Sequence, residues 1–411
     1  MYIVFFLTSI LLYLILRKFE DQDKMKKLYI IIMTLLLCFC TAFRNLAVGN
    51  DTYAYYLHFK SMDSVDLGSL INTLIDSIGI ESNNSNKDRG YPIIVKLAYH
   101  ICFGSFQCYQ FLVGLIVLCP LGYLIYHLVS KFYGYIFSYG FYLTIFYHYL
   151  PNSATRQSIA LGLFLCAAIL WIRKHNLIWP VILLLIASTI HKSVLIGALP
   201  FGLMYINDKR RFITYTIWGT IAMFVMGATI ALWLSNMVNS ENYALYSSST
   251  YYDKQATGKP MGYILQMISL FVLSLYNDTK INEDKIKYQF VRICFYLGIV
   301  FVPLILIDPS LIRLDAYFAI WGVIFIPNIL DHFEYNSRHL QIAFIIVFIL
   351  VLGRPLLSGT VKYRFEWEYM KLHERYSAVY NNFFDDPKGG CTLTNNQYNY
   401  TLCLSSKTKS C

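Results

Sequence analysis

The chain has 411 residues, of which 57% are hydrophobic and 17% aromatic but only 14% charged. Soluble domains carry about 25% charged residues, so this deficit and the repeated long apolar runs exclude a soluble globular protein. The runs are continuous, which excludes the alternating pattern of a membrane β-barrel. The net charge of +10 does not indicate a nucleic-acid partner, because most lysines and arginines lie in short loops between apolar runs. The composition predicts an all-α, polytopic membrane protein.

The apolar runs divide the chain into predicted transmembrane helices. Residues 2–16 have no basic leader and are followed by lysines and arginines, which predicts a retained anchor with its N-terminus outside. The hydropathy pattern predicts about 12 spans. They cover residues 2–16, 28–43, 106–127, 135–150, 158–172, 177–190, 194–206, 212–234, 261–276, 288–307, 314–330 and 340–352. We expect one integral membrane domain, residues 1–353, and an outer-side tail, residues 354–411.

Residues 44–105 form a long segment between two spans, on the predicted outer side. Residues 65–80 place apolar side chains on one helical face and polar ones on the other, which predicts an amphipathic helix on the outer membrane surface. Residues 91–103 are apolar but short for a span, so we predict a half-buried or re-entrant helix there.

The run from 177 to 206 has two interpretations. It is either one long helix with His191 buried midway, or two crossings that meet at His191. The basic clusters at Arg173-Lys174 and Lys209-Arg210-Arg211 should lie on the same side of the membrane, which favours two crossings.

Five polar sites fall at the predicted outer ends of apolar runs. They are Arg44 with Asp51, the stretch Asp88-Arg89-Gly90-Tyr91, Arg156, His191 and Arg313. A single arginine at a helix end can simply reach toward lipid headgroups. Several on one side instead indicate a basic cavity for an anionic ligand, and the planar guanidinium suits a diphosphate.

Two of these sites also have plain structural interpretations. Asp51 or Asn50 can cap the helix that Thr52 and Tyr53 open after the turn at Gly49. The sharper hypothesis is that Asp51 orients Arg44 or accepts a sugar hydroxyl. His191 is either a satisfied core histidine or a hydrogen-bond donor to a phosphate.

These five polar sites, in this order, resemble the motifs of the EpsG/Wzy-like family of bacterial polysaccharide polymerases. The resemblance covers roughly residues 44–330. It rests on Arg44-x-x-x-x-Gly49-x-Asp51-Thr52-x-x-Tyr55, Gly90-Tyr91, Arg156-Gln157-x-Ile159-Ala160, His191-Lys192-Ser193-x-Leu195 and Arg313-x-x-x-Tyr317-Phe318 followed by Pro327. One position departs from the pattern. Arg89 stands where an acidic residue is expected before the Gly-Tyr pair, with Asp88 adjacent.

The resemblance implies a GT-C-like glycosyltransferase on the outer face of the bacterial inner membrane. Such an enzyme moves a growing glycan from undecaprenyl diphosphate to the next lipid-linked repeat unit, with no metal or other cofactor. Its partners would be the lipid-linked oligosaccharide, the bilayer, a flippase and a chain-length regulator. We expect no nucleic acid.

The site residues follow from the motifs. We predict catalytic roles for Arg156, Arg313, Asp51 and His191. We predict substrate contacts for Arg44, Thr52, Tyr55, Arg89, Tyr91, Gln157, Lys192 and Tyr317. Two other functions stay open, a flippase for the lipid-linked unit and a membrane O-acyltransferase. A flippase would show charged residues in mid-membrane and two similar halves. An acyltransferase would show a histidine with a carboxylate nearby in sequence, which His191 lacks.

Overall fold

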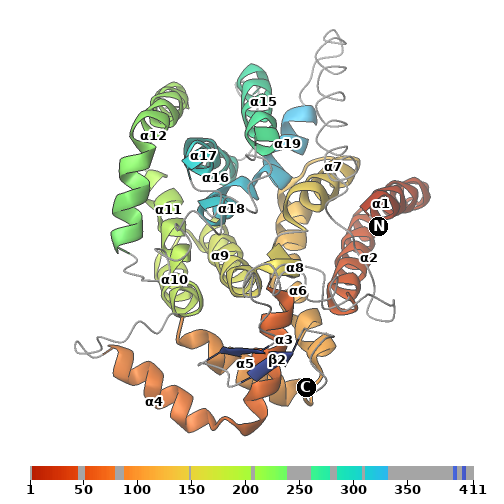
Figure 1. Cartoon of the computed structure of the whole chain (residues 1–411). Coiled ribbons are helices and arrows are strands. Elements are labelled where there is room, and N and C mark those ends of the chain that lie inside the picture. The colour runs from red at the N-terminus through yellow and green to blue at the C-terminus, as the bar shows by residue number, and fades with distance from the viewer. Residues whose placement is uncertain are drawn as a thin grey trace.

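The computed structural model describes residues 2–44, 51–78, 88–147, 150–204, 209–237, 261–277, 285–307, 311–331, 392–395 and 400–403 (Figure 1). The first half of the chain forms α1 Tyr2–Leu16, α2 Gln22–Ala42, α3 Thr52–Ser61, η1 Met62–Ser64, α4 Leu67–Ile78, α5 Gly90–Ile101, α6 Phe106–Leu128, α7 Gly134–Phe141, η2 Tyr142–Phe146, α8 Leu150–Ser153, α9 Thr155–Lys174 and α10 Ile178–Ile190. The second half forms η3 Lys192–Ala198, α11 Leu199–Leu203, α12 Lys209–Met237, α15 Met261–Asn277, α16 Lys285–Phe301, α17 Leu304–Ile307, α18 Ile312–Ala319 and α19 Gly322–Asp331.

The membrane part is helical, as the composition predicts. By length and composition, three of the described helices, α2, α6 and α9, can cross a bilayer, and α18 with α19, bent by 45°, can make a fourth. The predicted number of about 12 spans and the GT-C fold stay predictions. The predicted span 340–352 lies outside the described residues, as does most of the tail. Within the tail, β1 Thr392–Asn395 pairs antiparallel with β2 Tyr400–Cys403.

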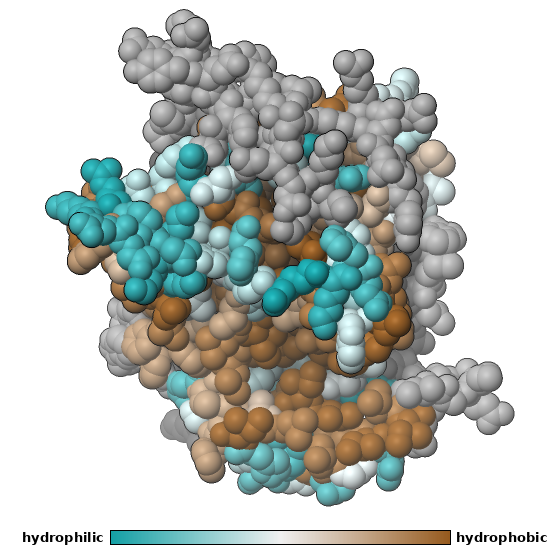
Figure 2. All heavy atoms as spheres, turned by 180° about the vertical axis from the view of Figure 1, so that it is seen from behind, coloured by the Kyte–Doolittle hydropathy of each residue, from teal (hydrophilic) through white to brown (hydrophobic). Residues whose placement is uncertain are grey.

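Large apolar side chains cover the outside of several helices. α1, α10 and α12 expose residues such as Leu11, Leu185 and Val225, which are 59%, 57% and 75% exposed. Seen from behind, brown surface dominates the middle and lower part of the molecule, with teal side chains above it and along its lower edge (Figure 2). Extended apolar surface of this kind suits lipid contact.

The helices approach one another closely at glycines. A Cβ on Gly162 of α9 would lie 2.3 Å from the carbonyl oxygen of Ile116 on α6. A Cβ on Gly298 of α16 would lie 3.0 Å from the backbone nitrogen of Ala319 on α18. Small residues at such crossings let backbones approach and increase van der Waals contact, which drives helix association in membranes.

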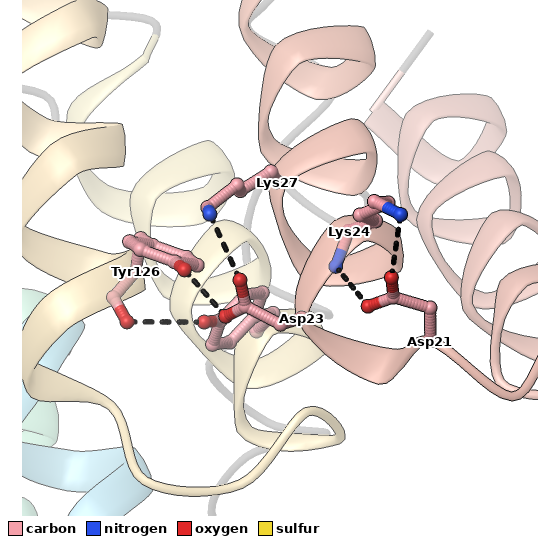
Figure 3. A network of polar contacts seen from close by, with 6 residues as sticks. Asp21, Asp23, Lys24, Lys27 and Tyr126 are labelled. Atoms are coloured by element: carbon pink, nitrogen blue, oxygen red, sulfur yellow. Dashed lines mark hydrogen bonds and ion pairs between the residues drawn. The ribbon is translucent and has the colours of Figure 1, made fainter.

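Contacts between charged and aromatic side chains mark one end of the bundle. Tyr126, near the end of α6, donates to Asp23 at the start of α2, and Asp23 pairs with Lys27 at 2.8 Å (Figure 3). Arg173, near the end of α9, lies 6.0 Å from the centre of the Tyr123 ring on α6. Exposed pairs contribute little stability. Their value here is that they place the start of α2 and the ends of α6 and α9 at the same end.

Residues 44–105 contribute the short helices α3, α4 and α5, which gather at the lower end of the molecule in Figure 1. α4 is the predicted amphipathic helix, and its Ile71 and Ile75 are 40% and 59% exposed. α5 is the predicted short apolar helix, with Lys96 buried and its ammonium donating to the carbonyl of Met62 at 2.7 Å. Their predicted positions at the membrane surface stay predictions.

The chain does not continue as one helix through His191. α10 ends at Ile190, and His191 has extended backbone angles, φ −157° and ψ 106°. The following 3₁₀ stretch, η3, packs back against α10 and also contacts α9 and α18. The helix is therefore broken at His191, between α10 and η3.

Candidate functional site

A buried carboxylate joins three segments at the other end of the bundle. Arg156 Nη1 donates to Asp88 Oδ2 at 2.9 Å, and His191 Nδ1 lies 3.6 Å from the same oxygen. The backbone N–H of Lys192 also acts on this carboxylate. The Asp88 side chain is 9% exposed and that of Arg156 is 36% exposed.

Each of these residues lies where a helix begins or ends. Arg156 is the second residue of α9, His191 follows the last residue of α10, and Asp88 lies two residues before α5. Asp88 has a φ of 56°, a left-handed conformation that is unfavourable for most residues but better tolerated by Asp and Asn. Residues held in such conformations cluster at functional sites.

Arg313 joins the site through a contact between neighbouring helices. Gln157, next to Arg156, donates from Nε2 to the backbone oxygen of Arg313 at 2.6 Å, which ties the start of α9 to the start of α18. The charges of both arginines act on Asp51 and on His191. The structure thus places Arg156 and His191 on one carboxylate and the backbone of Arg313 beside the start of α9, with Asp51 within reach of the charges of both arginines.

The two carboxylates of the site have different surroundings. Burial raises the pKa of Asp51, and the charges of Arg313 and Arg156 oppose this shift. Burial would also raise the pKa of Asp88, but His191 and Arg156 hold that pKa below its usual value. Burial lowers the pKa of His191, and Asp88 partly offsets this. Environments that move the pKa values of two acids apart are typical of acid–base sites.

Aromatic rings of α3, α5 and α6 lie beside Arg156. Its guanidinium carbon is 6.0 Å from the centre of the Tyr91 ring, within the range of a cation–π contact. The Tyr91 and Tyr109 hydroxyls are 3.1 Å apart, and the His58 ring stacks on Tyr91 at 5.5 Å. Tyr55 packs edge-on against Tyr91 and interacts with Arg156. Burial lowers the pKa of His58 to about 4, so this imidazole is neutral at pH 7.

Asp88, Arg156 and His191 form the Asp88 cluster. Arg44 and Arg89 contact protein groups outside this cluster. Arg44 is 4% exposed and donates to three neighbouring oxygens, of Thr41 at 2.5 Å, Gln110 at 3.0 Å and Thr52 at 3.4 Å. Arg89 donates to the carbonyl of Thr73 on α4 at 3.0 Å. The predicted substrate contacts of Arg44, Arg89 and Thr52 stay predictions.

The remaining predicted residues surround the cluster. Asp51 is the N-cap residue of α3, but its side chain makes no capping hydrogen bond, so the carboxylate is left for another role. The buried Tyr317 hydroxyl lies 3.2 Å from Ser193 Oγ and joins α18 to η3. The Lys192 side chain is exposed next to His191.

Asp88 is the residue that the sequence reasoning passed over in favour of Arg89. The available signal was the acidic residue two positions before Gly90. His58, Tyr109 and Gln110 were also missed. Gln110 offered a signal, since an amide inside an apolar helix indicates a polar partner, here Arg44.

Two further findings concern the possible metal ligands of the chain and its similarity to known proteins. Within the ranges that the structure describes, no group of three or more His, Cys, Asp or Glu side chains could hold a metal ion. The family model described as EpsG matches residues 27–364. The chain belongs to the EpsG family. No curated protein and no solved structure matches it.

Family membership confirms the resemblance carried by the motifs. An EpsG protein with long apolar helices is a membrane protein with a polysaccharide polymerase-type function, of the glycosyltransferase kind. The matched region contains the whole Asp88 cluster.

Proposed function

We propose that this EpsG protein polymerises oligosaccharide repeat units on the outer face of the bacterial inner membrane. It would transfer a glycan from undecaprenyl diphosphate to another lipid-linked repeat unit. The observation that carries the proposal is the meeting of two arginines, a histidine and two carboxylates at one end of an apolar bundle. A donor with a diphosphate and a long lipid requires cations beside hydrocarbon.

In this proposal Arg156 and Arg313 bind the diphosphate and stabilise the charge that it gains as it leaves. Arg156 donates to Asp88 from Nη1 and also interacts with Tyr55. The remaining N–H groups of its fork would donate to phosphate oxygens. Preorganised charge aimed at a leaving group is often the largest contribution to catalysis. Planar guanidinium groups also bind two oxygens at once.

Asp51 would accept the proton of the acceptor hydroxyl. Its side chain makes no capping bond, and burial raises the pKa of Asp51, which makes it a better base than an exposed aspartate. The hydroxyl oxygen then bonds to the anomeric carbon, the bond from that carbon to the diphosphate oxygen breaks, and the proton stays on Asp51.

The other predicted residues would shape and bind the substrate. Tyr55 and Tyr91 are buried beside Arg156 and would hold its guanidinium in position for the substrate. Lys192 offers an exposed charge next to His191. Gln157 and Tyr317 would act by holding α9, η3 and α18 together. A flippase and a chain-length regulator remain the predicted partners.

The test is repeat-unit polymerisation in a deletion strain that carries plasmid variants. Arg156→Ala should reduce long-chain glycan about 100-fold or more, the usual loss when a charge-stabilising donor is removed. Arg156→Lys should rescue poorly, because an ammonium cannot make the bidentate contact. Arg173→Ala, at the far end of the same helix, is the matched control and should keep full activity.

The length distribution of the surface glycan separates the candidate functions. A polymerase variant leaves single repeat units, a flippase variant leaves no surface units, and an acyltransferase variant leaves full-length glycan. Normal amounts of Arg156→Ala protein together with unchanged long chains would overturn the proposal.

A further inference from the structure

Asp88 is the fixed member of the cluster. Its side chain is almost buried, its carbonyl accepts the Tyr91 N–H at 3.0 Å, and its φ is 56°. Arg156, by contrast, has a third of its side chain exposed. A left-handed aspartate persists only where the surrounding structure determines it. The carboxylate is therefore well placed to orient the guanidinium.

The same carboxylate acts on His191. Only Nδ1 of the imidazole faces Asp88, at 3.6 Å. In the part of the chain that is described, neither ring nitrogen of His191 has a hydrogen-bond partner. A neutral imidazole carries its proton on one nitrogen, and an adjacent carboxylate favours the nitrogen that faces it. Nε2 is then an acceptor, and it cannot donate to a phosphate.

We propose that Asp88 is a positioning residue of the polymerase, which orients the Arg156 fork and keeps the His191 proton on Nδ1, so that Nε2 accepts a hydrogen bond from a sugar hydroxyl. This rests on the proposed function. It separates the site into a diphosphate side, with Arg156 and Arg313, and a sugar side, with His191.

The proposal predicts a change in rate and in pH dependence for Asp88→Asn. Asparagine keeps the size and tolerates the left-handed backbone, but it removes the charge. The assay uses full-length protein in proteoliposomes with the lipid-linked oligosaccharide that accumulates in the deletion strain. We expect kcat/KM to fall at least about tenfold, as for other residues that orient ligand-binding groups. Asp63→Asn, an exposed aspartate of the same segment, should keep the wild-type value.

The pH profile gives a readout that a purely structural role would not move. The charged groups that act on His191 are Asp88, before α5, Arg156 of α9 and Arg313 of α18. Below the pKa of His191, Nε2 becomes a donor and kcat/KM should fall. This fall in kcat/KM is the acid limb of the pH profile. Asp88 raises the pKa of His191 and the arginines lower it, so Asp88→Asn should move the acid limb to lower pH.

A double-mutant cycle tests whether Asp88 acts through His191. In a His191→Ala background, Asp88→Asn should no longer move the limb, and the two losses should be less than additive. Additive losses, or an Asp88→Asn profile equal to wild type, would overturn the positioning role. If wild-type protein does not polymerise the oligosaccharide, the proposed function fails instead.

The tautomer can be measured without activity. Nitrogen-15 NMR of histidine-labelled protein, with His191 assigned by its loss in His191→Ala, should show a protonated Nδ1 in wild type. A protonated Nε2 would refute the inference even if Asp88→Asn did not fold.

Discussion

Arg44 and Arg156 are both arginines at one end of the helical bundle, but their side chains have different surroundings. Arg44 is 4% exposed and donates to three protein oxygens. The Arg156 side chain is 36% exposed, donates to Asp88 at 2.9 Å and interacts with Tyr55. A buried guanidinium with several protein acceptors stabilises the fold, whereas an exposed one beside a fixed carboxylate is available for a ligand.

Arg44→Ala should therefore destabilise the protein. It leaves the carbonyl of Thr41 and the amide oxygen of Gln110 without this donor, and unpaired buried polar groups are costly. We expect a loss of about 3 kcal/mol, measured as a lower melting temperature in detergent. Arg173→Ala, near the exposed end of α9, is the control and should melt like wild type. An unchanged melting temperature for Arg44→Ala would contradict its structural role.

Asp88 was missed because the prediction selected its neighbour, Arg89. Arg89 and Asp88 are adjacent, and sequence spacing alone does not say which side chain points inward. The left-handed backbone at Asp88 turns its carboxylate to Arg156, while Arg89 reaches Thr73 on α4. Local backbone conformation of this kind depends on the packing around it.

At the scale of elements, the site depends on how closely α5 approaches α10. A Cβ on Gly90 would lie 2.2 Å from Thr189 Oγ1 and 2.8 Å from Thr189 Cβ. Gly90 lies two residues after Asp88, and Thr189 lies two residues before His191. The absence of a side chain at Gly90 thus lets the carboxylate and the imidazole meet.

Gly90→Ala should push α5 away from α10 and reduce polymerisation at least about tenfold, because displacing a positioned group by about 1 Å is costly for catalysis. Gly202→Ala is the control, since nothing lies within 4 Å of its added Cβ. Thr189→Ala, which removes the nearest clashing atom, should restore part of the activity of Gly90→Ala. Full activity of Gly90→Ala in the glycan-length assay would contradict this close approach.

The break in the helix at His191 shows which features of the helical segments hydropathy predicts and which it does not. The basic clusters predicted two membrane crossings between 177 and 206. The structure breaks the run after Ile190, at the end of α10, and the two crossings stay a prediction. The short η3 and α11 segments, which together run from Lys192 to Leu203, were not predicted as such. Their form depends on packing against α9, α10 and α18, which a local hydropathy window does not contain.

At the scale of the whole molecule, the bundle has two chemically different ends. The start of α2 and the ends of α6 and α9 carry Lys27, Tyr126 and Arg173. The opposite end carries the Asp88 cluster. The predicted topology assigns the first end to the cytoplasm and the second to the outside, because basic loops stay inside.

This orientation predicts which side chains a membrane-impermeant maleimide labels in intact cells. In a cysteine-free variant, Asp63→Cys of the outer segment should react from outside. Lys174→Cys, at the end of α9, should react only after permeabilisation. Both positions are exposed, so accessibility within the protein does not decide the result. Labelling of Lys174→Cys in intact cells, with none of Asp63→Cys, would reverse the topology.

The sequence by itself determined the class of protein, its helical character, and the residue types from which the site is built. These depend on hydropathy and on ordered motifs, which are local properties of the chain. The tertiary structure decided that Asp88 joins Arg156 to His191, that Gln157 brings Arg313 to them, and that Arg44 is buried among Thr41, Thr52 and Gln110. These contacts join residues far apart in the chain, because helix packing places their termini at one end, and no local pattern specifies that arrangement.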